Sequence, residues 1–329
     1  MLDPSGHRDT FARDRLPPVE LWPVMDYGVL PGLAYPKRLN AAAELLDRMV
    51  ERGCGPRPCL ITHAASWTYD ELLDTANRIA NFLVRELGVV PGNRVLLRAA
   101  NTPMLVACWF AVLKAGGIAV ATMPLLRARE LAYIINKAEV QFCLCDKVLR
   151  EDLESALKLS PRPISRAYFN DDAPDSVETR MARQPREFVN AATSRDDVAI
   201  IAFTSGTTGT AKGTMHFHRD LLASCDCFPP HVLKPRADDL FCGSPPLAFT
   251  FGLGGLVLFP LRIGAATLLV EKPLPEALLE SIARHRATVL FTAPTAYRVM
   301  AEHAGSYDIK SLRDCVSVGE PPAPPLVQA

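Results

Sequence analysis

The chain has 329 residues, of which 49% are hydrophobic, and its 36 Lys plus Arg are balanced by 36 Asp plus Glu. This length exceeds the size at which one hydrophobic core stops growing, so we expect at least two packed subdomains. The absence of net charge provides no field to attract nucleic acid or an anionic membrane, and we therefore expect small molecules as partners, with no nucleic acid and no membrane.

The beginning of the chain and its cysteines bear on location and metal binding. The first residues, MLDPSGHRDT, contain no apolar run, so we expect no secretory signal and a cytoplasmic protein. Nine cysteines scattered through a long chain predict reduced thiols. The pairs Cys143/Cys145 and Cys225/Cys227 lack a second pair at zinc-site spacing, so we assign no metal.

Helices and short buried strands are predicted to alternate from residue 40 onward. Asn40 is a plausible cap for a helix that continues to Val50, and Thr68 with Glu71 forms a capping-box pattern for a second helix that stops at Gly88. A third helix follows Thr102 and ends at residues 116 and 117. Apolar runs bounded by turn residues predict strands at 94–99, 118–122, 140–145 and 198–203. The polar segment 170–197 is predicted to be a linker.

The same alternation continues in the second half of the chain. We expect strands near Leu240, Ala266, Val289 and Val316, and helices from Leu253 and at 275–286. The run 251–270 has membrane-spanning length, but Pro, Arg and Gly interrupt it, which favours a buried helix, a turn and a strand. The pattern predicts an α/β fold of parallel sheets flanked by helices. We divide it into an N-terminal extension (1–39), a first α/β subdomain (40–195) and a second, incomplete one (196–329).

The sequence TSGTTGTAKG, residues 204–213, directly follows a predicted buried strand and carries most of the functional information. Its glycines let the backbone turn its amides toward an anion, its hydroxyls add donors, and Lys212 adds a positive charge. The spacing does not match the Walker A pattern. A flexible Ser/Thr/Gly surface linker is the alternative, but it explains neither the strand nor the lysine. We interpret the loop as a polyphosphate cradle.

This loop is similar to the TSGTTGxPKG loop of the adenylate-forming enzymes, with Ala211 where proline is usual. The blocks WTYDEL (67–72), LKAGGIAV (113–120) and SVGEPP (317–322) extend the resemblance over nearly the whole chain. The blocks DTFARDRLPPVELWP, TMHFHRD and PPLAFTFGLGG resemble the benzoate and 2-aminobenzoate CoA ligase branch. The fold implied is the large N-terminal domain of this family.

The resemblance implies an acid–CoA ligase that uses ATP, Mg²⁺ and coenzyme A. A carboxylate attacks the α-phosphorus of ATP and expels pyrophosphate, and the thiol of coenzyme A then attacks the acyl adenylate. By the same resemblance, the residues that bind the ATP phosphates are Thr204, Ser205, Gly206, Thr207, Thr208, Gly209 and Lys212.

An acyl and coenzyme A pocket is expected around Phe249, where many relatives have histidine. Its aromatic ring favours a flat, aromatic acid, although a core phenylalanine fits the residue alone equally well. Ala293, Pro294, Thr295 and Gly319 resemble other residues of this pocket, and Glu320 resembles a residue on the adenine side. A helix start and a strand end explain these residues without a site. His216 and His218 form an H-x-H pair for which we expect packing or hydrogen bonding rather than metal ligation.

Relatives in this family are longer, and the resemblance places their catalytic lysine beyond residue 329, so we identify no catalytic residue here. We expect this polypeptide alone to show little adenylation activity, since a phosphate loop by itself cannot orient the attack. Two alternatives remain: a non-catalytic nucleotide-binding remnant, and an adenylation module that feeds a carrier protein.

Overall fold

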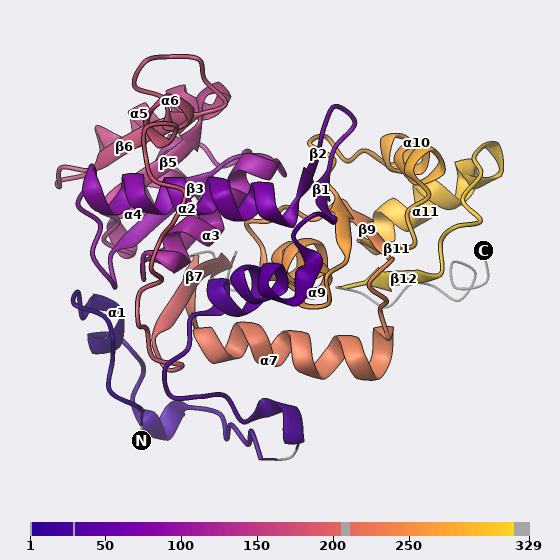
Figure 1. The fold of residues 1–329 in the computed structure, drawn as a ribbon. Coiled ribbons are helices and arrows are strands. Elements are labelled where there is room, and N and C mark those ends of the chain that lie inside the picture. The colour runs from indigo at the N-terminus through magenta and orange to yellow at the C-terminus, as the bar shows by residue number, and fades with distance from the viewer. Residues whose placement is uncertain (1, 29, 205–210, 319–329) are drawn as a thin grey trace.

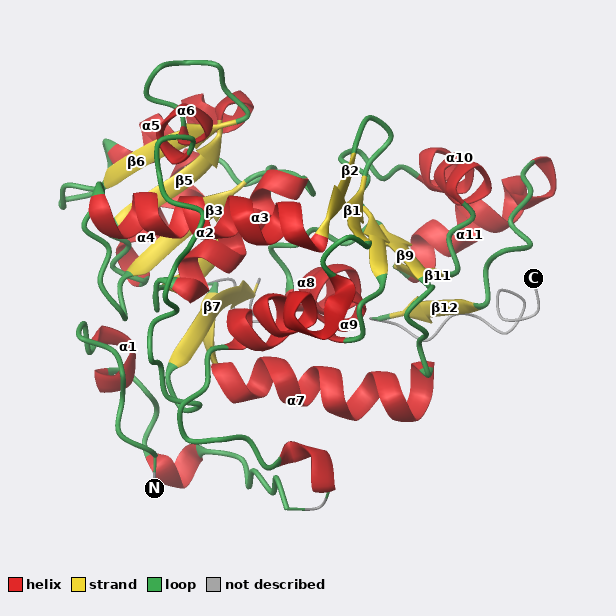
Figure 2. Ribbon diagram, viewed as in Figure 1, coloured by secondary structure: helices red, strands yellow, loops and turns green. Residues whose placement is uncertain are grey.

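The chain folds into two six-stranded sheets with helices packed against their faces (Figure 1). The structure is a computed structural model that describes residues 2–28, 30–204 and 211–318. The first sheet has the strand order β6-β5-β3-β4-β7-β8 and the second has the order β12-β11-β9-β10-β1-β2. Neighbouring strands are parallel except for the pairs β7–β8 and β1–β2, so each sheet carries one antiparallel edge strand. Figure 2 shows β1 and β2 in the second sheet together with β9 and β11. The predicted α/β class with parallel sheets is confirmed.

The strands are short and the helices are mostly two to five turns long. The strands are β1 (Pro58–Ile61), β2 (Ser66–Thr68), β3 (Arg94–Arg98), β4 (Ile118–Thr122), β5 (Phe142–Asp146), β6 (Ser165–Phe169), β7 (Val198–Thr204), β8 (Lys212–Phe217), β9 (Leu240–Gly243), β10 (Ala266–Leu268), β11 (Val289–Thr292) and β12 (Asp314–Ser317). The α-helices are α1 (Phe11–Asp14), α2 (Tyr69–Arg85), α3 (Pro103–Lys114), α4 (Ala128–Lys137), α5 (Arg150–Leu157), α6 (Val177–Met181), α7 (His218–Phe228), α8 (Thr250–Leu253), α9 (Phe259–Arg262), α10 (Pro275–His285) and α11 (Pro294–His303). Among the described residues, four π-helical segments lie between or beside these helices, at Ala43–Asp47, Val50–Cys54, Pro229–Leu233 and Gly254–Leu258.

Alternate residues of the first sheet enter two different cores, as the two-residue period of a strand requires. On β3, Val95 and Leu97 belong to a core shared with α2 and α3, whereas Leu96 belongs to a second core. That second core packs against α4 and α5 through Leu131 and Leu153. Both faces of the first sheet are therefore covered, which explains why its strands read as continuous apolar runs.

The second sheet divides its side chains in the same way. Phe241 and Phe291 enter the large core shared with the first sheet, whereas Cys242 and Leu290 pack on the opposite face with α10 and α11. The two sheets thus share one central core built by α2, α3 and the helical segment 250–262. Because both sheets pack on one core, loops that follow strands of the first sheet can contact loops that follow strands of the second sheet.

Local signals in the sequence account for the ends of the main helices. The Thr68 hydroxyl accepts a hydrogen bond from Glu71 N–H at 3.2 Å and the Glu71 carboxylate accepts one from Thr68 N–H at 2.7 Å, which completes the predicted capping box of α2. Thr102 caps α3 by accepting from Leu105 N–H at 3.3 Å. Gly88, beyond the end of α2, has φ +76°, a conformation that other residues rarely adopt.

The segment 170–197 differs from the predicted linker, because its residues 182–187 are fastened to α2 by hydrogen bonds. It contains α6, and the buried Asn81 donates from Nδ2 to Glu187 O at 2.9 Å and to Pro185 O at 3.1 Å. Arg78 Nη1 donates to Gln184 O at 3.0 Å. In these bonds the segment contributes backbone carbonyls, which leave no pattern in the side-chain sequence.

Each sheet contains strands from both sides of the predicted subdomain boundary between residues 195 and 196. β1 and β2 come from the first half of the chain but pair within the second sheet, while β7 and β8 follow residue 195 and pair within the first. The location of the subdomain boundary stays a prediction.

The apolar run 251–270 forms a helical segment whose last part is α9, and a turn and the strand β10 follow it, as predicted. Across the described residues, no helix combines the length and apolar character needed to cross a membrane.

Candidate functional site

The glycine- and hydroxyl-rich loop connects the two strands of the β7–β8 hairpin. Thr204, the last residue of β7, pairs with Lys212, the first residue of β8, and both are exposed. Directly opposed residues of an antiparallel pair project to the same face, so the hydroxyl and the ammonium group begin and end the loop on one side of the hairpin. A helix, α7, begins only at His218, which distinguishes this strand–loop–strand unit from the strand–loop–helix unit of Walker A proteins. The predicted phosphate ligands Ser205, Gly206, Thr207, Thr208 and Gly209 lie outside the described residues.

A cavity of about 630 Å³ lies where β4 and β7 end. In sheets of this kind, ligands bind outside the carboxyl ends of the strands, and this cavity is in that position. The described residues that line it come from β4 and the turn after it, from α4, from the two ends of the loop, and from the segment before α8: Ala121, Thr122, Met123, Leu126, Arg129, Glu130, Tyr133, Ile134, Phe203, Thr204, Ala211, Ala248 and Phe249. The structure thus brings Thr204 and Phe249, two of the residues predicted from the sequence, to one cavity.

Helix α4 forms a wall of this cavity that the sequence did not reveal. Tyr133 donates its hydroxyl hydrogen to Ala211 O at 2.9 Å, which fastens the returning end of the loop to α4. Arg129 and Glu130 bring one charge of each sign to the same wall. A polar helix face turned toward a cavity has the same sequence pattern as a face turned toward solvent, so no periodicity could have distinguished the two.

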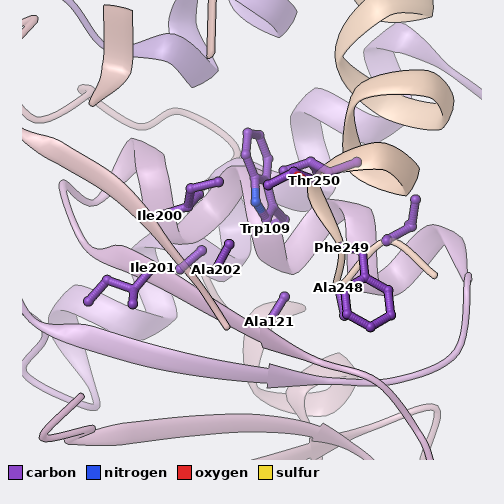
Figure 3. A pocket seen from close by; sticks show the side chains of 11 residues that line it. Trp109, Ala121, Ile200, Ile201, Ala202, Ala248, Phe249 and Thr250 are labelled. Carbon is purple, nitrogen blue, oxygen red and sulfur yellow. The ribbon is translucent and has the colours of Figure 1, made fainter. Parts of the chain in front are cut away.

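Phe249 occupies the turn between β9 and α8, where its backbone N–H donates to Pro246 O at 3.0 Å. Its ring lines the large cavity and also a narrow apolar cavity of about 10 Å³, bordered by Trp109, Ala121 and Ile200 (Figure 3). Because Phe249 is 37% exposed, it is not the fully enclosed core residue that the alternative interpretation requires. The ring therefore presents an accessible aromatic surface at the cavity.

The turn that carries Phe249 is held by a buried amide from the first sheet. Asn101, which is 5% exposed and follows β3, donates from Nδ2 to Pro245 O at 3.0 Å and accepts at Oδ1 from Leu247 N–H at 2.9 Å. Helix α8 lies close behind this turn, because a Cβ atom on Gly252 would lie 2.2 Å from Pro246 O. Asn101 and Gly252 together fix the position of the turn, and sequence patterns did not single out either residue.

The remaining predicted pocket residues lie at the carboxyl end of β11 in the second sheet. Ala293 precedes α11 and is exposed, Pro294 is the first residue of the helix, and Thr295 is exposed. They are not among the described residues that line the 630 Å³ cavity. Gly319 and Glu320 fall outside the described residues.

The two histidines after the loop make hydrogen bonds of different range, His218 with a distant segment and His216 with a neighbour on β8. His218 is fully buried and accepts at Nδ1 from Ala41 N–H at 3.1 Å, as the hydrogen-bonding interpretation predicted. Burial, with a smaller contribution from His7, lowers the pKa of His218 to about 3, so its imidazole is neutral at pH 7. His216 Nε2 lies 3.3 Å from Thr214 Oγ1. Within the described ranges, no group of three or more His, Cys, Asp or Glu side chains is arranged to hold a metal ion.

The model of the AMP-binding enzyme family matches residues 46–329, which include the hairpin, the loop and the Phe249 turn. The chain belongs to the AMP-binding enzyme family. This AMP-binding enzyme chain is 30% identical over 293 residues to the benzoate–CoA ligase of Thauera aromatica, an alignment that covers 88% of this chain and 56% of that protein. It is also 30% identical over 255 residues to the anthranilate–CoA ligase of Pseudomonas aeruginosa, covering 76% of this chain and 47% of that protein.

Solved structures give the same picture of the AMP-binding enzyme fold. The crystal structure of the anthranilate CoA ligase AuaEII in complex with anthranoyl-AMP is similar with a TM-score of 0.84 and 27% identity, covering 92% of this chain and 57% of that one. A benzoate CoA ligase from Burkholderia xenovorans LB400 is similar with a TM-score of 0.79 and 26% identity, covering 88% of this chain and 58% of that one. The predicted family and fold are confirmed, and the chain spans about half the length of the relatives it matches.

Proposed function

We propose that this chain forms the phosphate- and acid-binding portion of an AMP-forming CoA ligase that activates an aromatic carboxylic acid of the benzoate or 2-aminobenzoate type. The observation that carries the proposal is the single cavity lined by both ends of the phosphate loop and by Phe249. A nucleotide held by the loop and an aromatic group held against Phe249 would meet there. The relatives whose names specify benzoate or anthranilate support the choice of acid.

In the first half-reaction, a carboxylate oxygen bonds to the α-phosphorus of ATP and the bond between that phosphorus and the bridging oxygen to the β-phosphate breaks. The electron pair leaves with pyrophosphate, so negative charge grows on the group that the loop would hold. Thr204 and Lys212 lie at the two ends of the loop on one face of the hairpin, where a hydroxyl and an ammonium group stabilise that charge. Mg²⁺ enters with ATP as the MgATP substrate.

The second half-reaction needs room for a thiol beside the acyl group. The thiol sulfur of coenzyme A bonds to the acyl carbon, the carbon–oxygen bond to AMP breaks, and the thiol proton is released. We assign Phe249 to this step, and its 37% exposure and its position on the lining of two cavities support the assignment. An aromatic ring at this place offers stacking area to a flat acid and apolar contact to the pantetheine arm of coenzyme A.

Binding of ATP by the 329-residue chain tests the assignment of the loop. We expect the Lys212→Ala variant to bind MgATP about 10- to 100-fold more weakly than the parent chain in isothermal titration calorimetry, because one charge-assisted contact contributes about 1.5–3 kcal/mol. Lys158→Ala removes an exposed lysine at the end of α5 and serves as the control, with no expected change in affinity. Absence of ATP binding, or equal affinity in the two variants, contradicts the proposed phosphate site.

Exchange of labelled pyrophosphate into ATP tests the reaction itself. We expect little exchange from this chain alone, and exchange that depends on benzoate or 2-aminobenzoate from the product of the full genomic frame that contains it. Thioester formation with coenzyme A identifies a ligase, whereas acyl transfer to a carrier domain alone identifies an adenylation module. ATP binding by the full product without any exchange identifies a non-catalytic remnant and refutes the proposed activity.

A further inference from the structure

A pair of histidines lies on the surface of the second sheet, in a part of the molecule that the proposed reaction does not use. His63 lies in the turn between β1 and β2, and His285 lies in the last turn of α10. Their facing ring nitrogens, His63 Nδ1 and His285 Nε2, are 3.2 Å apart, and the ring centroids are 5.2 Å apart. The two residues are 222 positions apart in sequence, so only the tertiary fold creates the pair.

The buried Ser281 determines which nitrogen of His63 carries hydrogen. Ser281 is fully buried and its hydroxyl donates to Ala277 O at 2.6 Å, one turn earlier in α10. Its oxygen also lies 3.1 Å from His63 Nε2. Since the single hydroxyl hydrogen is already donated, the oxygen accepts a hydrogen bond from His63 Nε2–H. The neutral ring of His63 therefore has its lone pair at Nδ1, directed toward His285.

We infer that His63 and His285 form a binding site for a divalent transition-metal ion that prefers imidazole, such as Zn²⁺, Ni²⁺ or Cu²⁺. Two nitrogens each about 2.0–2.1 Å from one zinc ion at a tetrahedral angle are separated by about 3.3–3.4 Å, close to the separation already present. Metal-binding histidines commonly donate their second ring N–H to a fixed oxygen, and Ser281 provides this oxygen for His63.

Both histidines are available to a metal from solvent. His63 is exposed and His285 is partly exposed, so an ion can reach the space between the rings. In the metal-free pair, His285 Nε2–H donates to the lone pair of His63 Nδ1. On metal binding this hydrogen moves to His285 Nδ1, which gives the other tautomer of the neutral ring, and the Nε2 lone pair binds the metal without net loss of a proton.

The two protein ligands leave the remaining coordination positions to water. The described residues contain no third His, Cys, Asp or Glu positioned to complete such a group. We therefore expect a modest, exchangeable affinity rather than a permanent structural metal. The bound ion would join the β1–β2 turn to α10 and so stabilise the outer layer of the second sheet by mass action.

Metal titration with matched variants tests this site. In calorimetric titration with Ni²⁺ at pH 7.5, we expect one site per chain, and at least a tenfold loss of affinity in His63→Gln and in His285→Gln. His303→Gln, which removes an exposed histidine of α11, and Cys315→Ser, which removes the exposed thiol, should each keep the affinity of the parent chain. Ser281→Ala should weaken binding about 10- to 100-fold through loss of the supporting hydrogen bond.

Spectroscopy distinguishes imidazole from other ligands. Electron paramagnetic resonance of bound Cu²⁺ should show coupling to imidazole nitrogen in the parent chain, and this signal should be lost in both His63→Gln and His285→Gln. The inference is overturned if no ion binds at 1 mM, a concentration on the order of the weakest useful affinity, or if binding persists unchanged in the two histidine variants. An unchanged affinity in Ser281→Ala would overturn the role given to that serine.

Discussion

Replacing Asn101 by alanine should loosen the turn that positions Phe249. The amide of Asn101 is 5% exposed and makes two hydrogen bonds to the backbone of this turn, one to Pro245 O and one from Leu247 N–H. Alanine leaves both backbone groups without their partner in a place that water does not easily reach. Each backbone group left without a hydrogen-bond partner costs about 1–2 kcal/mol, so the change should lower the free energy of unfolding by about 2–4 kcal/mol.

Thermal unfolding followed by circular dichroism measures this loss. An unfolding entropy of about 2.1 cal/mol/K per residue, applied to the whole chain, converts the loss into a midpoint lower by about 3–6 °C. The control is Asn136→Ala, in which an exposed asparagine on α4 loses one surface hydrogen bond that it accepts from the Ser160 hydroxyl. Its midpoint should stay within about 1 °C of the parent chain.

The site provides a second readout for the Asn101 variant. In the full gene product, a displaced Phe249 should raise the KM for the aromatic acid while the affinity for ATP, which depends on the hairpin loop, stays the same. If Asn101→Ala unfolds at the same temperature as Asn136→Ala, the two hydrogen bonds do not hold the turn. The proposed coupling between the first sheet and the Phe249 turn would then be wrong.

Two further predictions concern stability, one at the helix behind the Phe249 turn and one at the buried His218. Gly252→Ala should destabilise the chain by about 1–3 kcal/mol, because the new Cβ would lie 2.2 Å from Pro246 O, whereas Gly305→Ala, with no atom within 4 Å, should be neutral in the same thermal assay. The low pKa of His218, about 3, means that only the unfolded chain gains a proton as pH falls below its ordinary value of 6.5. The free energy of unfolding should therefore decline from about pH 6.5 toward pH 3. The decline should be less steep in His218→Asn, which lacks the titrating group but can still accept a hydrogen bond from Ala41 N–H. If the free energy of unfolding in urea falls equally steeply with pH in both chains, the prediction is wrong.

The sequence by itself determined the local elements and the family. The capping box at Thr68, the helix start at Thr102 and the buried strands depend on neighbours within a few residues, so their signals are complete in short stretches. The loop that ends at Lys212 carries its glycines, hydroxyls and charge in one continuous motif. This motif, together with the blocks WTYDEL, LKAGGIAV and SVGEPP, predicted the family that the model match over residues 46–329 confirms.

Only the tertiary structure decided which distant segments meet. Residues of α4, of the hairpin and of the Phe249 turn line one cavity. Asn101, which follows β3, makes hydrogen bonds to a turn 144–146 positions later in the sequence. The pair His63 and His285 arises in the same way. These contacts follow from the order of strands within the sheets and from two sheets packing on one core. Strand order depends on the packing of the whole chain, and no local pattern of residues encodes it.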